Sequence, residues 1–212
     1  MSYDYSENIL VQESAGHLLV DELGWQVELA YNQEVLGENG TFGRSSYKDI
    51  LLVRYFQKAL RTLNPWITDA QVTEAQNTFE KHLSSASLMQ INEEKYAYIR
   101  DGIPVTEKKP NGQTEEKRAI IIDFQHPNDM ERNHFLAVKE MKIHGDLYRR
   151  RTDIVGFVNG IPLLFIELKK NSVDVQNAYT DNYTDYLDTI PQLFYYNAFL
   201  MLSNGVEAKG GT

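Results

Sequence analysis

The chain has 212 residues, of which 42% are hydrophobic, so it can bury the core of one folded domain. It contains no cysteine, which excludes disulfides and thiolate metal sites, and no apolar run approaches the roughly 18 residues of a membrane span. The net charge of −9 argues against tight, unaided binding of nucleic acid, because Lys and Arg drive phosphate binding. The first residues lack the features of a signal peptide, so we expect a cytoplasmic protein without membrane contact.

Apolar spacing up to about residue 102 predicts mostly helices. Gly24 is a typical helix stop and Pro65 halts a second periodic segment, whereas Thr68 is a plausible helix cap. The expected helices cover 13–24, 49–63, 68–83 and 87–99, and one expected strand covers 25–31.

From Ile103 onward, short apolar runs predict strands instead. Asn159-Gly160 is typical of a hairpin turn between two runs within 152–168. Further strands are expected at 120–122, 135–138 and 198–202, a helix at 172–187, and a loop or hairpin tip at 107–117. The expected fold class is α/β, a mixed central sheet flanked by helices, with a helical insertion or subdomain at about 45–102 and a core at about 103–205.

Candidate chemistry gathers at the end of the second run. Glu167 and Lys169 are two residues apart on a predicted strand, so their side chains share a face. The preceding run is apolar on both faces, which places these charges at the margin of a buried sheet. Asp153, at the start of the first run, is the partner carboxylate if strand register brings it to the same face.

Strand register decides whether this site exists. A two-residue loop at Asn159-Gly160 pairs Asp153 with Ile166 and turns it away from Glu167. A three-residue loop with Gly160 in the left-handed conformation puts both carboxylates on one face. We therefore expect an odd-length loop or a β-bulge in this hairpin.

Two carboxylates on one face suit a hard cation such as Mg²⁺, with Asp153, Glu167 and the backbone carbonyl of Leu168 as ligands. Lys169 can then orient or help to deprotonate a bound water. The alternative is a hairpin whose charged ends form an ordinary surface ion pair.

Basic residues cluster near this hairpin despite the overall acidity. They can meet DNA phosphates, or they can be solvated surface. The candidate DNA-binding residues are Lys142, Arg149, Arg150, Arg151 and Lys170. A second set could be read as metal ligands, but Pro127 and the irregular spacing favour a polar loop. That set is His126, Asp129, Glu131 and His134.

Asp153 followed by Glu167-Leu168-Lys169 resembles the active-site hairpin of the PD-(D/E)xK nuclease superfamily. An ordered set of segments along the chain also resembles the amino-terminal domain of type I restriction enzyme R subunits. These segments include Leu23-Gly24-Trp25, Gly43-Arg44-Ser45, Ile122-Asp123-Phe124, Asn133-His134-Phe135, Phe157 to Leu163 and Ile190 to Phe194. The resemblance implies a restriction-endonuclease-like core and magnesium-dependent cleavage of double-stranded DNA.

The resemblance also assigns two further positions. The family's acid on the opening helix falls on Glu13, with Glu22 as the rival. The family's Gln-x-x-x-Tyr motif fits poorly, because counting forward from Ala178 gives Asp181, whereas counting back from Ile190-Pro191 gives Asn182 and Tyr186. The tyrosines of this segment, Tyr186 among them, could equally serve helix packing.

The resemblance finally implies a complex with methyltransferase and specificity subunits. The chain has no Gly-x-x-x-x-Gly-Lys phosphate loop, so we expect a fragment of a longer subunit whose missing motor domains bind ATP. The alternative function is a non-catalytic DNA-docking or subunit-interaction module with a nuclease-like fold.

Overall fold

The computed structural model describes residues 7–212. Its centre is a six-stranded sheet of order β1-β4-β7-β8-β9-β10. The β1–β4 and β8–β9 pairs are parallel and the other neighbours antiparallel, so the mixed α/β fold expected from the sequence is confirmed. The strands are β1 (Gln26–Leu29), β4 (Phe135–Lys139), β7 (Ile154–Val158), β8 (Ile161–Leu168), β9 (Phe199–Ser203) and β10 (Ala208–Gly211).

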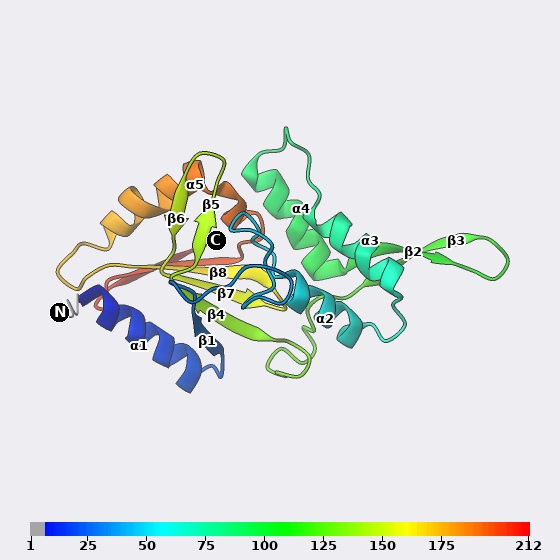
Figure 1. Cartoon of the computed structure of the whole chain (residues 1–212), viewed down its shortest axis with the longest axis horizontal. Helices are drawn as coiled ribbons and strands as arrows, with labels where there is room; N and C mark the ends of the chain where they lie inside the picture. The colour runs from blue at the N-terminus through cyan, green and yellow to red at the C-terminus, as the bar shows by residue number, and fades with distance from the viewer. Residues whose placement is uncertain (1–6) are drawn as a thin grey trace.

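Helices cover both faces of this sheet, and a further group packs at one end of it (Figure 1). α1 (Glu7–Asp21) lies on one face, and a π-helix (Ala178–Tyr183) that continues into α5 (Thr184–Thr189) lies on the other. The group at the end of the sheet consists of α2 (Val53–Leu63), α3 (Asp69–Glu80) and α4 (Leu88–Asp101). A short 3-10 helix (Pro191–Phe194) follows α5. Within residues 7–212, no helix is long and apolar enough to cross a membrane.

Successive side chains of a strand point to opposite faces of the sheet, so each face of the central sheet packs against its own hydrophobic cluster. Ile154, Ile166 and Leu168 pack with Leu19 of α1. The residues between them point the other way, where Val155, Phe157 and Phe165 join the aromatic residues around α5. A side chain in register with Phe165 therefore faces α5, and one in register with Ile166 faces α1.

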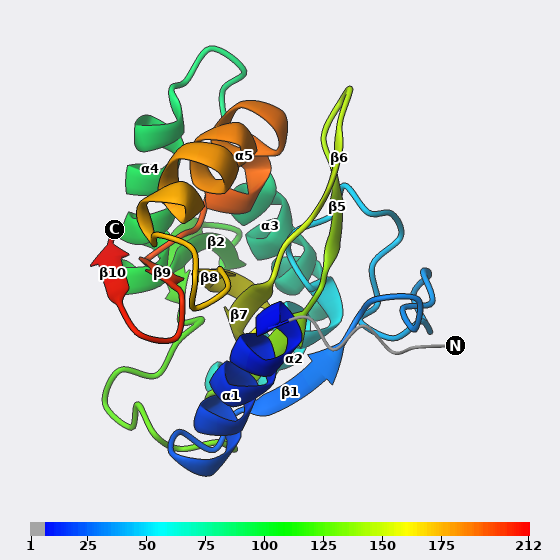
Figure 2. The same cartoon turned by 90° about the vertical axis from the view of Figure 1, so that its left-hand side faces the viewer.

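Two small antiparallel ribbons lie outside the central sheet. β2 (Ile103–Lys108) and β3 (Thr114–Ala119) form an arm beyond α2, α3 and α4 (Figure 1). β5 (Lys142–His144) and β6 (Arg149–Arg151) form a ribbon that rises from the start of β7 (Figure 2).

Several predicted elements need correction. The strand expected at 120–122 is wrong, because the polar residues Thr114–Ala119 pair with β2 instead and the apolar run follows as coil. β5, β6 and β10 were not expected, since their residues carry no apolar alternation. The sheet also includes β1, within the strand expected at 25–31, and β10 after residue 205.

Candidate active site

The β7–β8 hairpin combines a two-residue turn with a β-bulge. Val158 pairs with Ile161 across Asn159-Gly160, so the three-residue loop is wrong. Both turn residues have positive φ, 52° and 81°, as an Asn-Gly turn requires. Further along, the register shifts between Gly156 and Phe157, and Ile154 then pairs with Ile166. This is the bulge that the sequence called for, and the shifted register sets Asp153 opposite Glu167.

The bulge has a local cause. Gly156 lies so close to its neighbours that an added Cβ would meet Leu164 and Trp25, each at 2.8 Å. Pro162 sits in the strand beside the register shift, where a missing N–H is tolerated. Gly and Pro inside two predicted strands are the sequence signals that could have located the bulge.

Asp153 and Glu167 meet on the α5 side of the sheet. Glu167 pairs with Leu202, which belongs to the core cluster around α5. The Leu168 N–H donates to Asp153 Oδ2 at 2.7 Å, and this bond ties the first carboxylate to the end of β8. Glu167 is 3% exposed, and its Oε2 has no hydrogen-bond partner among the described residues. One oxygen of a buried carboxylate is thus left without a hydrogen-bond partner in the described part of the chain.

Burial raises the pKa of both carboxyl groups. For Asp153, burial raises the pKa to about 6, against lowering by the Leu168 N–H and by the charge of Lys169. For Glu167, burial and then the charge of Asp153 raise the pKa well above its ordinary value. Two desolvated carboxylates side by side are unfavourable without a compensating cation.

Lys169 follows at the sheet margin, half-buried, and its Nζ donates to the side-chain oxygen of Asn182 on the π-helix. A π-helix turn holds one residue more than an α-helix turn. The glutamine position of the motif therefore falls on different residues when it is counted from the two ends of this segment. This extra residue accounts for the conflict between Asp181 and Asn182 at the glutamine position. The structure brings Asn182 to Lys169 and leaves Asp181 exposed.

Tyr186 packs on the same side of the sheet. It is 5% exposed, and its hydroxyl donates to the backbone carbonyl of Arg151 at 3.1 Å. Burial first, and the charge of Glu167 second, raise its pKa. Tyr186 therefore remains a neutral hydrogen-bond donor beside the carboxylates.

Glu13 lies apart from these groups. It accepts from Lys139 Nζ at 2.6 Å, and Lys139 pairs with Ile154, on the α1 face of the sheet. Gln12 instead reaches the centre, because its amide donates to the Asp153 carbonyl at 3.3 Å. The rival Glu22 is exposed near the other end of α1. Sequence periodicity gave no sign of Gln12, since the contact spans 141 positions.

The donor atoms at this centre are of the kind that Mg²⁺ prefers. Within residues 7–212 no group of three or more Asp, Glu or His side chains is placed to hold a metal ion, so any ion would rest on two carboxylates, backbone and water. That is the donor set that Mg²⁺ usually takes in proteins. The open Oε2 of Glu167 and the raised pKa of Asp153 both favour a cation there.

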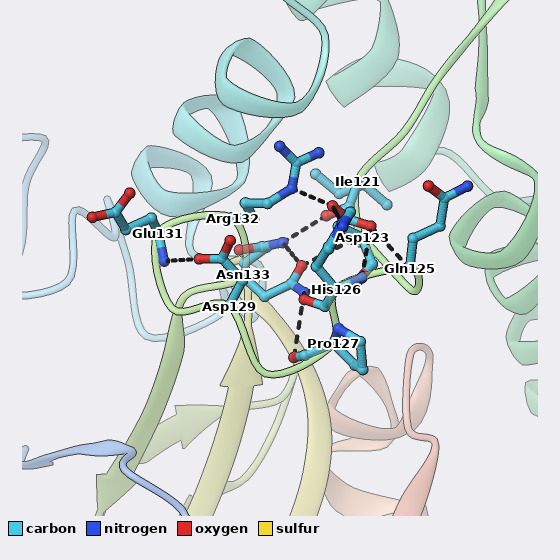
Figure 3. Close-up of polar contacts among 10 residues, drawn as sticks. Ile121, Asp123, Gln125, His126, Pro127, Asp129, Glu131, Arg132 and Asn133 are labelled. Atoms are coloured by element: carbon cyan, nitrogen blue, oxygen red, sulfur yellow. Dashed lines mark hydrogen bonds and ion pairs between the residues drawn. The ribbon is translucent and has the colours of Figure 1, made fainter.

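The loop before β4 forms a separate polar network (Figure 3). The Asp123 carboxylate accepts from the His126 and Arg132 side chains. The Asn133 side chain accepts from the Asp123 N–H and donates to the Asp123 carbonyl. Asn159 joins this network through Asn133 and also donates to the Ile121 carbonyl at 2.7 Å. These contacts hold the loop against the turn of the β7–β8 hairpin, and they pair His126 with Asp123 rather than with Asp129 or Glu131.

The candidate DNA-binding residues separate into three groups. Arg150 forms a two-bond ion pair with Asp185 of α5, at 2.5 and 2.8 Å. Lys142 and Arg151 both lie against the ring of Tyr31. Arg149 and Lys170 are exposed, and the structure pairs neither with a carboxylate within residues 7–212.

Comparison with known proteins identifies relatives along nearly the whole chain. A family model described as "Type I restriction enzyme R protein N terminus" matches residues 4–212. The chain is 32% identical over 197 residues to the type I restriction enzyme HindI endonuclease subunit of Haemophilus influenzae, covering 91% of the chain and 18% of that protein. It is 30% identical over 174 residues to a putative MjaIXP endonuclease subunit of Methanocaldococcus jannaschii, covering 80% and 16%. The chain thus spans less than a fifth of these relatives.

Proposed function

The chain belongs to the family of type I restriction enzyme R protein N-terminal domains, and on that premise we propose that it is a magnesium-dependent endonuclease domain that cleaves double-stranded DNA. Its relatives are named as restriction endonuclease subunits, and within them this domain accounts for 18% and 16% of the length. In the proposal, the remaining length supplies the ATP-driven motor, and methyltransferase and specificity subunits complete the restriction complex.

One observation carries the proposal. Glu167 is buried and Asp153 half-buried beside it, both have raised pKa values, and one oxygen of Glu167 has no partner among the described residues. A fold that needed only stability would gain by replacing them with neutral residues. Strongly perturbed groups of this kind cluster at functional sites.

Asp153, Glu167 and the Leu168 carbonyl would hold the ion. Bound Mg²⁺ would supply charge neutralisation at the scissile phosphate and a more acidic water. Lys169 places a positive charge at the margin of the site, where it can orient the attacking water or contact a phosphate oxygen. Asn182 fixes the Lys169 ammonium, and Gln12 fixes the backbone that carries Asp153.

The test is plasmid cleavage by the complete restriction complex that carries this domain, with ATP and Mg²⁺. Asp153→Asn, Glu167→Gln and Lys169→Met should each reduce cleavage at least about 100-fold while circular dichroism shows a folded domain. Asp188→Asn, a neutralised exposed aspartate on α5, is the matched control and should cleave normally. Full cleavage by the Asp153 and Glu167 variants would favour the alternative, a docking module without chemistry.

A further inference from the structure

The β5–β6 ribbon carries its basic residues on one face. Lys142 pairs with Arg151, and His144 pairs with Arg149. Paired residues of an antiparallel ribbon point the same way, as do residues two apart on one strand. All four side chains therefore share one face, which we call the basic ribbon face (Lys142, His144, Arg149 and Arg151).

The opposite face attaches the ribbon to the body of the protein. Ile143 is fully buried, and its cross-strand partner Arg150 makes the two-bond ion pair with Asp185. The His144 carbonyl also accepts from the Gln192 side chain at 2.9 Å. The ribbon is therefore held at a defined angle, and Arg150 is an anchor rather than part of the basic face.

Two tyrosines support the basic ribbon face from the segment that follows β1. Arg151 and Lys142 lie 4.7 and 5.4 Å from the ring centre of Tyr31. The ring of Tyr47 lies 4.8 Å from the His144 ring. Arg151 is exposed and Lys142 half-buried, so neither of the two cations that contact Tyr31 is fully buried beneath it. A shared aromatic ring is one way to keep two neighbouring cations together despite their repulsion.

Lys142, Arg149 and Arg151 place three positive charges on this face, whereas the neighbouring Arg44 and Lys48 are paired with Glu34 and Asp146. Burial lowers the pKa of His144, and four cations lower it further: Arg149, Arg44, Lys142 and Lys48. The nearby carboxylate of Glu140 lies 3.5 Å from Arg151 and offsets one charge. Like charges opposite each other in a ribbon reduce its stability. An arrangement with that cost calls for an anionic partner.

The ribbon also leads directly into the candidate active site. Backbone hydrogen bonds also join the segment that follows β4 to the segment that precedes β7. The Glu140 N–H donates to the Asp153 carbonyl at 2.8 Å, and the Thr152 N–H donates to the Met141 carbonyl at 3.1 Å. Arg151 lies two residues before Asp153. Figure 2 shows the ribbon extending from the end of the sheet where β7 begins.

We propose that the basic ribbon face, supported by Tyr31, binds the phosphate backbone of duplex DNA beside the scissile bond. The inference rests on the proposed function, because it names the surface that brings DNA to the Asp153–Glu167 centre. A two-stranded ribbon is narrow enough to follow a DNA groove, and phosphate contacts from Arg and Lys set the position of a protein without reading sequence. DNA binding then depends on Lys142, Arg149 and Arg151, and Arg150 contributes only through the angle of the ribbon.

The experiment is fluorescence anisotropy of a labelled duplex with the 212-residue chain in EDTA, at several salt concentrations, so that no cleavage intervenes. The variant Lys142→Gln/Arg149→Gln/Arg151→Gln should weaken binding at low salt at least about tenfold and reduce the salt slope by about 2 to 3, at about 0.9 per lost phosphate contact. The matched control removes three charges from the other ribbon, Lys108→Gln/Lys109→Gln/Lys117→Gln, and should leave the slope unchanged. Tyr31→Leu should weaken binding about threefold, and Tyr31→Phe should not.

An unchanged salt slope in the triple variant, or an equal loss in the control, would overturn the inference; the basic ribbon face would then be a contact for an acidic protein surface. Circular dichroism of each variant separates lost binding from lost folding. Failure here is distinct from failure of the proposed function: Asp153→Asn should bind DNA in EDTA at least as well as the wild type. A chain that binds through the ribbon but lacks cleavage in the complete complex would refute only the nuclease proposal.

Discussion

Asp153→Asn should stabilise the metal-free protein. Burial raises the pKa of this carboxyl from an ordinary 3.8 to about 6, and such a rise corresponds to about 3 kcal/mol of penalty on the ionised form. An acid whose pKa is raised on folding destabilises the folded state as pH rises from about 4 through 6, and the full penalty persists above that range. The neutral amide avoids the penalty but is a poorer acceptor for the Leu168 N–H, so we expect a net gain of about 2 kcal/mol at pH 8.

Urea unfolding in EDTA at pH 8 and pH 4 measures this gain. At pH 4 the wild-type carboxyl is already protonated in the folded state, so the difference should shrink below about 1 kcal/mol. Asp188→Asn, exposed on α5, should change stability little at either pH. A variant that is less stable than the wild type at pH 8, or a gain that is equal at both pH values, would refute the desolvated carboxylate pair.

Three further outcomes follow from the same contacts. The affinity of the metal-free protein for Mg²⁺ should rise with pH through about 6, because the ion competes with the proton on Asp153, and an affinity that is flat from pH 5 to 8 would contradict this. Asn159→Ala should lower the free energy of unfolding by about 3 kcal/mol, because it leaves the Ile121 carbonyl and the His134 N–H without partners; Asn39→Ala, at an exposed position, is the control. Asn182→Ala should reduce cleavage about tenfold and Asn182→Gln should restore part of it, because only a side-chain oxygen can hold the Lys169 ammonium; equal activity of both variants would remove Asn182 from the site.

The site residues were predictable where the signal is local. Glu167 lies in β8 and Lys169 directly follows its last residue, so period-two alternation alone puts them on one face. The Asn159-Gly160 turn was equally visible. Parity then required an odd-length loop or a bulge to include Asp153, and the chain uses the bulge that Gly156 permits.

Other features depend on contacts that no local pattern reveals. The pairing of Glu13 with Lys139, and the approach of Gln12 to Asp153, depend on how α1 lies across the sheet. The β5–β6 ribbon has almost no apolar alternation, because Arg149, Arg150 and Arg151 occupy a whole strand. Its order comes from Ile143 and the Arg150–Asp185 pair, which tertiary structure supplies.

Titration of the metal-free protein with Mg²⁺ by calorimetry at pH 8, for the wild type and Glu167→Gln, tests the central claim most directly. The account predicts binding to one site in the wild type and its loss in the variant, because the open Oε2 of Glu167 is the oxygen that the ion would use. Asp188→Asn should titrate like the wild type. Equal binding by Glu167→Gln and the wild type would contradict the account, since the paired carboxylates would then hold no metal.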